Sequence, residues 1–224
     1  MRIFKRTMLW AGILLLLAGL FYRPLPPVQA APAAEIQCHT YEIYLPLIAN
    51  GENNQITSCL SSEEEALAGL INAYRAENHL PPVPLSQSLT RVAQAHVHDL
   101  YENNPVTEEC NLHSWSDKGN WTPVCYTADH KNASGMWLKP KEITNGAYPG
   151  NGYEIAYWHS AQATAEGAFN AWKSSSGHNA VMIETGIWQE KDWGAMGIGI
   201  YQNYAVVWFG EKTDPLGSVT ACTP

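Results

Sequence analysis

The chain has 224 residues, and its 21 acidic side chains outnumber the 13 basic ones, which gives a formal net charge of -8 at pH 7. Nucleic acids and anionic membrane surfaces are bound through basic patches, so this charge balance argues against either as the main partner. The length suffices for one domain of ordinary size with its own hydrophobic core.

The N-terminus has the layout of a secretory signal peptide. Three basic side chains within the first six residues precede an apolar run from Met8 to Tyr22, and a proline-broken stretch follows and ends at Ala30. We expect cleavage after Ala30, and a protein that is secreted, extracellular or in the cell envelope. The alternative is a retained membrane anchor, but the run is shorter than the ~20 residues that a span needs. No later segment is long and apolar enough, so we expect no transmembrane segment after cleavage.

Five cysteines follow the expected cleavage site: Cys38, Cys59, Cys110, Cys125 and Cys222. They would therefore meet an oxidising compartment, in which disulfides form. Cys110 and Cys125 flank a loop that contains Trp and Pro, and we predict a disulfide between them. Five is an odd number, so one thiol is free or pairs with another chain, and the spacing leaves the pairing of the other three open.

The chain after the leader begins with residues 31–60, which have little regular periodicity and are expected to form a tether or an extended segment. A capping box, Ser62 with Glu65, then predicts a helix start. Apolar residues at helical spacing from Leu67 to Tyr74 give this helix a buried face, and Pro81 lies beyond its end. A second helix is expected from Ser86 until Pro105, with an apolar face that includes His96.

Residues 105–152 are rich in Gly, Pro, Asn and Trp and are expected to form a long Trp-rich loop insert, a kind of segment that is usually functional when ordered. A helix over 160–172 follows. Near the C-terminus, strands over 193–201 and 204–209 flank a turn at Gln202–Asn203. Helices followed by antiparallel strands indicate an α+β fold. We expect a single domain over 61–215 and a C-terminal tail over 216–224.

The chain has eight histidines, and for six of them a structural or solvated role is the expected one. These six are His39, His79, His96, His98, His130 and His159. His96 and His98 are two residues apart on a helix, so they face different directions and do not bind one metal together.

Three residues stand out by their surroundings. His113 lies inside the expected Cys110–Cys125 loop, Glu154 lies in a Gly- and Tyr-containing segment, and His178 follows the Ser- and Gly-rich end of a helix. Two imidazoles and a carboxylate are ligands that zinc accepts, with water in an open fourth position. Their spacing alone does not establish a site.

Several motifs, in this order, resemble those of bacterial CAP domains, the family of cysteine-rich secretory proteins, antigen 5 and pathogenesis-related proteins. An opening helix contains Asn72 and Arg75 and leads through a proline link into an Ala-rich second helix. The later motifs are Gly152–Ile155, Ala168–Trp172, Ser175–His178, Gly197–Ile200 and Tyr204–Phe209. The resemblance covers about two thirds of the chain.

The resemblance implies a three-layer α-β-α sandwich with a central antiparallel sheet. It also implies a cleft with two His and two Glu, which in several members binds a divalent cation. The first His falls on His113, the first Glu on Glu154 and the second His on His178. The second Glu falls on Ser175 and is missing, and Glu184 or Glu166 is a candidate substitute. A zinc site with water as fourth ligand remains chemically adequate.

Three Trp residues lie within the insert: Trp115, Trp121 and Trp137. Exposed indoles would stack on a sugar ring or an apolar ligand, whereas buried ones would hold together a loop that has no core of its own. The sequence leaves both alternatives open.

Three functional classes remain. We favour a secreted binding or effector module without turnover, whose ligand is a lipid, a glycan or a protein. The second class is a metal-assisted extracellular hydrolase, which the missing second Glu and the absence of standard hydrolase motifs count against. The third is a structural cell-envelope protein. Because fold does not fix function, the sequence does not name the ligand.

Overall fold

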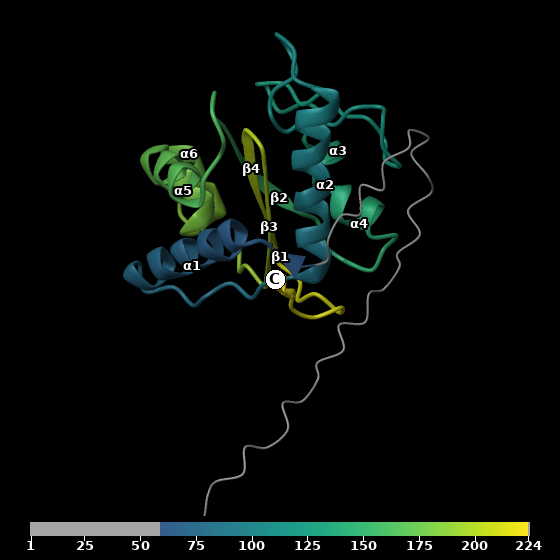
Figure 1. Cartoon of the computed structure of the whole chain (residues 1–224). Helices are drawn as coiled ribbons and strands as arrows, with labels where there is room; N and C mark the ends of the chain where they lie inside the picture. Colours follow the sequence, from purple (N-terminus) through teal and green to yellow (C-terminus); the bar gives the residue numbers. More distant parts are fainter. Residues whose placement is uncertain (1–58, 224) are drawn as a thin grey trace, which may run out of the picture. The chain divides into compact units, whose positions relative to one another are not determined.

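The computed structural model describes residues 59–223. Its centre is a three-stranded antiparallel sheet in the order β2-β4-β3, made of β2 (Tyr153–Trp158), β3 (Ala195–Tyr201) and β4 (Tyr204–Gly210). Helices α1 (Ser62–Glu77), α5 (Ala165–Ser174) and α6 (Ser176–Met182) cover one face, and α2 (Gln87–Asn103) covers the other (Figure 1). The expected α+β fold, an α-β-α sandwich with a central antiparallel sheet, is confirmed.

The alternation of side chains along each strand divides the core in two. Ile155, Ile198 and Val207 pack with α1 and α5. Ala156 and Trp208, which point to the other face, pack with α2. Glu154 precedes Ile155 on β2, so it faces the α2 layer together with Ala156.

α1 begins one residue earlier than the sequence predicted. Ser61 is the N-cap, its hydroxyl accepts a hydrogen bond from the Glu64 backbone N–H, and the Glu64 carboxylate accepts one from the Ser61 backbone N–H, 2.8 Å away. The predicted box of Ser62 with Glu65 was therefore wrong by one position. Glu64 is buried as a result, whereas Glu65 is exposed.

α2 follows the sequence prediction closely. Ser86 is its N-cap, and the helix ends at Asn103, two residues before Pro105. The helix packs tightly on β3, because a Cβ atom on Gly197 would lie 2.0 Å from the carbonyl carbon of Leu89. Only glycine allows the helix backbone to approach the strand this closely.

Residues 104–152 contain short helices, α3 (Ala133–Trp137) and α4 (Lys139–Ile143), connected by turns. Trp115 is 2% exposed and its backbone pairs with Val124. Trp121 and Trp137 are partly buried against the core. The insert is thus folded onto the α2 layer, and the Trp115 indole contributes to packing rather than to an exposed stacking surface.

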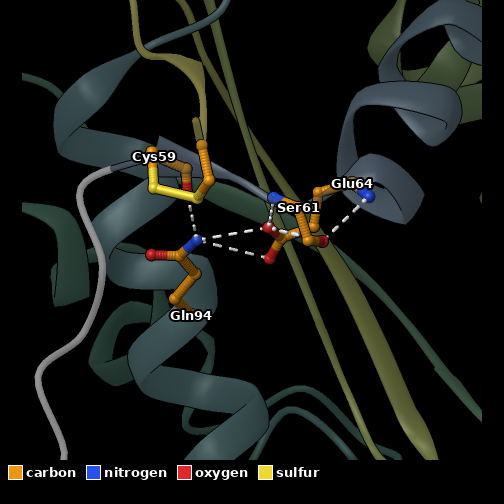
Figure 2. Close-up of a disulfide and its surroundings, with 5 residues drawn as sticks. Cys59, Ser61, Glu64 and Gln94 are labelled. Atoms are coloured by element: carbon orange, nitrogen blue, oxygen red, sulfur yellow. Dashed lines mark hydrogen bonds between the residues drawn. A yellow bond between two sulfur atoms is a disulfide. The ribbon is translucent and has the colours of Figure 1, made fainter. Parts of the chain in front are cut away.

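Two disulfides are present within residues 59–223. Cys110–Cys125 is confirmed, and Cys59–Cys222 joins β1 (Cys59–Leu60) to β5 (Thr220–Ala221), which pair in parallel. Gln94 of α2 lies beside the second disulfide and donates a hydrogen bond to the Cys59 carbonyl oxygen, 3.0 Å away (Figure 2). The two disulfides use every cysteine except Cys38, which lies outside the described residues.

The described unit is therefore longer than the 61–215 domain expected from the sequence, because residues 220–222 pair with its first strand and close a disulfide. α5 is shorter than expected: Thr164 is its N-cap, and its hydroxyl accepts a hydrogen bond from the Gly167 N–H. A short 3-10 turn, η1 (Gly186–Trp188), follows α6.

The expected signal peptide (1–30) and most of the expected tether (31–58) lie outside the described residues. Between residues 59 and 223, no helix has the length and apolar character to cross a membrane.

Candidate functional site

Glu154 is the centre of the candidate site. Its side chain is 0% exposed, and β2 places it between the sheet and α2. One carboxylate oxygen, Oε1, is in contact with Nδ1 of His96, and the other, Oε2, lies 2.7 Å from Nδ1 of His113. The buried carboxylate therefore joins two imidazoles that come from different parts of the chain.

His96 lies on α2 and is fully buried. Its Nε2 atom lies 3.0 Å from the Ser114 carbonyl oxygen, which only accepts, so Nε2 carries a hydrogen. Burial lowers the pKa of His96, but the charge of Glu154 and hydrogen bonds to Glu154 and Ser114 outweigh burial, and the pKa is raised. Burial likewise raises the pKa of Glu154, but the two imidazoles outweigh it and the pKa is lowered. Both shifts favour the charged forms, a carboxylate and an imidazolium, in which His96 donates to Glu154.

His113 lies in the Cys110–Cys125 loop, with 19% of its side chain exposed. Its backbone N–H donates to the Asn111 side chain, and its ring meets the Tyr126 ring edge-on at a centroid distance of 5.1 Å. Burial and the nearby Glu154 charge raise the pKa of Tyr126. Because the carboxylate accepts from Nδ1, Nε2 is the nitrogen of His113 that remains for a ligand.

His178 lies on α6 and its Nδ1 atom is 2.9 Å from the Ser175 hydroxyl oxygen. Burial, with a further contribution from the nearby His113 charge, lowers the pKa of His178. The lowered pKa favours the neutral ring, which is the form that binds metals. Its engaged nitrogen is again Nδ1, so Nε2 remains for a ligand.

Residues 68–203, more than half of the chain, match the model of the CAP family, the cysteine-rich secretory protein family. The chain belongs to this family. The expectation drawn from the motifs is therefore confirmed at the level of the family and the fold.

Three solved structures are similar to this chain, each over 67% of its length. They are an extracellular SCP-domain protein of Bacillus anthracis (18% identity, TM-score 0.47), a cysteine-rich secretory protein of Staphylococcus aureus (18%, 0.41) and an outer surface protein of Borrelia burgdorferi (19%, 0.43). The matched region spans 40%, 39% and 93% of those chains. No curated protein matches the chain.

Measured against the family pattern, the structure brings His113 and Glu154 into direct contact, whereas His178 contacts Ser175. Among residues 59–223, no group of three or more His, Cys, Asp or Glu side chains has the arrangement of metal ligands. Both Glu154 oxygens already accept hydrogen bonds from imidazoles. Zinc binding stays a prediction.

Neither candidate substitute for the second Glu, Glu184 or Glu166, contacts His113 or His178 in the described part of the chain. Glu184 forms an ion pair with Arg75, 3.1 Å away, and accepts the Trp193 N–H. Glu166 is exposed and lines a groove of about 580 Å³ between α1 and α5. Ser175, at the position of the missing Glu, contacts the second imidazole, that of His178.

The sequence did not predict the contact between His96 and Glu154. His96 is one of the six histidines for which a structural or solvated role is expected, and its burial agrees with the structural alternative. The one available signal was its place on the apolar face of α2, where an imidazole needs partners for both ring nitrogens.

Proposed function

We propose that this protein is a secreted CAP-domain binding module without turnover, whose cleft presents Nε2 of His113 and of His178 to a divalent cation such as zinc. One observation carries the proposal. Nδ1 of each ring is already engaged, by Glu154 at 2.7 Å and by Ser175 at 2.9 Å. Each ring is thus oriented and keeps its second nitrogen.

The donor set suits zinc, because imidazole nitrogen is one of its preferred ligands. Two imidazoles would hold the ion, and waters or a ligand group would complete its coordination. Glu154 is better suited to orienting His113 than to ligating, since a carboxylate on the far nitrogen of a ligating His is a common supporting contact. A bound zinc would supply a Lewis acid for an anionic or polar group of the ligand.

The same geometry favours binding over hydrolysis. Metal-assisted hydrolysis uses a group that takes a proton from the attacking water. Glu154 is fully buried with both oxygens occupied, and the position of the second acid holds Ser175. Among residues 59–223, no carboxylate other than Glu154 forms an ion pair or hydrogen bond with His113 or His178.

Secretion is supported by the two disulfides, because such bonds persist in oxidising compartments. N-terminal sequencing of the protein from its native source tests the proposed cleavage. A first residue at Ala31 is expected, and an intact Met1 in a membrane fraction would contradict it. Exclusive recovery in an insoluble envelope fraction would favour the structural alternative.

Competition with a chromophoric chelator tests the metal. We expect one zinc per chain, lost in His113→Ala and in His178→Ala and retained in His98→Ala, which alters a histidine on the same helix as His96. Affinity should fall as the pH drops through the imidazole range near ~6.5, because the ligating rings must be neutral. Wild-type protein that binds no zinc would overturn the metal proposal, and zinc-dependent hydrolysis abolished by His178→Ala would overturn the assignment as a module without turnover.

A further inference from the structure

His96 is held more completely than any other imidazole of the site. Its Nε2–H donates to the Ser114 carbonyl oxygen and its Nδ1–H donates to Oε1 of Glu154. Both ring nitrogens are satisfied inside the protein, so the ring has no hydrogen-bonding reason to rotate.

Aromatic contacts fix the plane of the same ring. Trp115 stacks on His96 with a centroid distance of 4.1 Å and an interplanar angle of 6°, and Trp208 meets it edge-on at 6.2 Å. Both indoles are buried, with relative exposures of 2% and 0%. His96 is therefore a rigid donor at a defined position on Glu154.

A carboxylate with a donor on one oxygen only can rotate and exchange its two oxygens, and it can lose a second, weaker contact as it does so. Glu154 has two donors, one per oxygen, and the donor on Oε1 is immobile. Oε2 is therefore held as the acceptor for Nδ1–H of His113, which is partly exposed and lies in a loop. His96 thus fixes the orientation of the Glu154 carboxylate, and the carboxylate in turn fixes the orientation of the His113 ring.

We propose that His96 is a positioning residue that, through Glu154, holds His113 in the Nδ1–H tautomer and so keeps Nε2 of His113 as its ligand atom. The value of this arrangement for metal binding rests on the proposed function. The tautomer itself does not, and it can be observed in metal-free protein.

The first test measures the tautomer. Histidine-specific ¹⁵N NMR of the metal-free protein distinguishes a ring nitrogen that carries hydrogen from one that does not, and His113→Ala assigns the signals. Wild-type His113 should show hydrogen on Nδ1 only. His96→Leu should shift both ring nitrogens of His113 toward averaged tautomers, and His98→Ala, the matched control on α2, should leave them unchanged.

The second test measures zinc affinity by chelator competition. Loss of a supporting contact of this kind weakens metal binding by about 10- to 100-fold, and we expect that range for His96→Leu and no change for His98→Ala. His96→Asn places an amide N–H near the position of Nδ1, so it should restore both the tautomer and most of the affinity.

The outcomes separate the two proposals. If wild-type protein binds no zinc but His96→Leu still releases the tautomer of His113, the metal proposal fails and the positioning role stands. If His96→Leu is folded and leaves the tautomer and affinity unchanged, the positioning role is overturned. If His96→Leu does not fold, His96→Phe decides, because it keeps a ring stacked on Trp115 but removes both nitrogens. A folded His96→Phe variant with an averaged His113 tautomer supports the role, and a single Nδ1–H tautomer overturns it.

Discussion

Arg75 near the end of α1 forms an ion pair with Glu184 beyond α6, with 3.1 Å between Nη2 and Oε1, and both side chains are nearly buried. Arg75 also donates from Nη1 to the Met182 carbonyl oxygen, 2.7 Å away, and from Nε to the Pro81 carbonyl oxygen, 3.0 Å away. One guanidinium thus donates hydrogen bonds to carbonyl oxygens in two places. One is the C-terminal end of α6, the helix that carries His178, and the other is the link between α1 and α2.

We expect Arg75→Ala to lower the free energy of unfolding by about 3–5 kcal/mol, because it leaves the nearly buried Glu184 charge without its counter-ion and the buried Met182 carbonyl oxygen without its Arg75 donor. Urea denaturation measures the loss. Lys131→Ala, which removes an exposed ion pair with Asp129, is the control and should have no measurable effect. A loss at Arg75 no larger than that of the control would contradict the prediction.

Glu64 should make stability depend on pH. It accepts hydrogen bonds from the Ser61 backbone N–H and hydroxyl, the Ile200 N–H and Gln94, yet burial dominates and raises its pKa. The folded state then binds the proton more tightly than the unfolded state. The stabilisation is complete below the unfolded pKa of ~4.3 and is lost as the pH rises through the higher folded-state value.

The test compares unfolding free energies of wild type and Glu64→Gln between pH 4 and 7. We expect the variant to be less stable overall, because its amide places a donor among donors. The difference in unfolding free energy between wild type and the variant should shrink as the pH rises. For Glu65→Gln, at the exposed neighbouring position, the unfolding free energy should change with pH in parallel with that of wild type. An advantage that grows with pH would show that the hydrogen bonds, not burial, control Glu64.

The two disulfides should contribute unequally. Cys59–Cys222 has a sequence separation of 163 and Cys110–Cys125 one of 15. The chain-entropy model gives about 5 kcal/mol for the longer loop and about 3 kcal/mol for the shorter one. Thermal denaturation of the two double Cys→Ala variants should show the larger loss for Cys59 and Cys222. Zinc affinity should show the opposite order, because the shorter loop carries His113, and equal effects on affinity would contradict this.

The sequence predicted the fold well where the signal is local. Apolar spacing located the buried faces of α1 and α2, and the Gln202–Asn203 turn between two β-rich runs located the β3–β4 hairpin. The start of α1 was one residue off because Ser61 and Ser62 are each followed by a Glu at the third position, and only the backbone conformation distinguishes them.

The contacts of the site were less accessible from the sequence. His96 meets Glu154 across 58 positions, and that contact depends on which face of β2 packs on α2 and at which height. Hydrophobic periodicity predicts which face of β2 packs on α2, but not which residues along the two elements lie opposite one another. The partner of Cys59 is likewise 163 positions away and is fixed only when β1 and β5 pair.

Ser175 offers the most direct test of how the second imidazole is held. Its hydroxyl is the only described partner of His178 Nδ1, at 2.9 Å, and it makes no capping hydrogen bond to α6. Ser175→Ala should therefore weaken zinc binding by about 10-fold, the low end for a supporting contact, because a neutral hydroxyl holds an imidazole less firmly than a carboxylate does. Global stability should change little, and Ser176→Ala, at the exposed next position, should alter neither quantity. Chelator competition and urea denaturation on the same samples separate the two effects. Unchanged affinity in Ser175→Ala would mean that packing of α6, rather than the hydroxyl, orients His178.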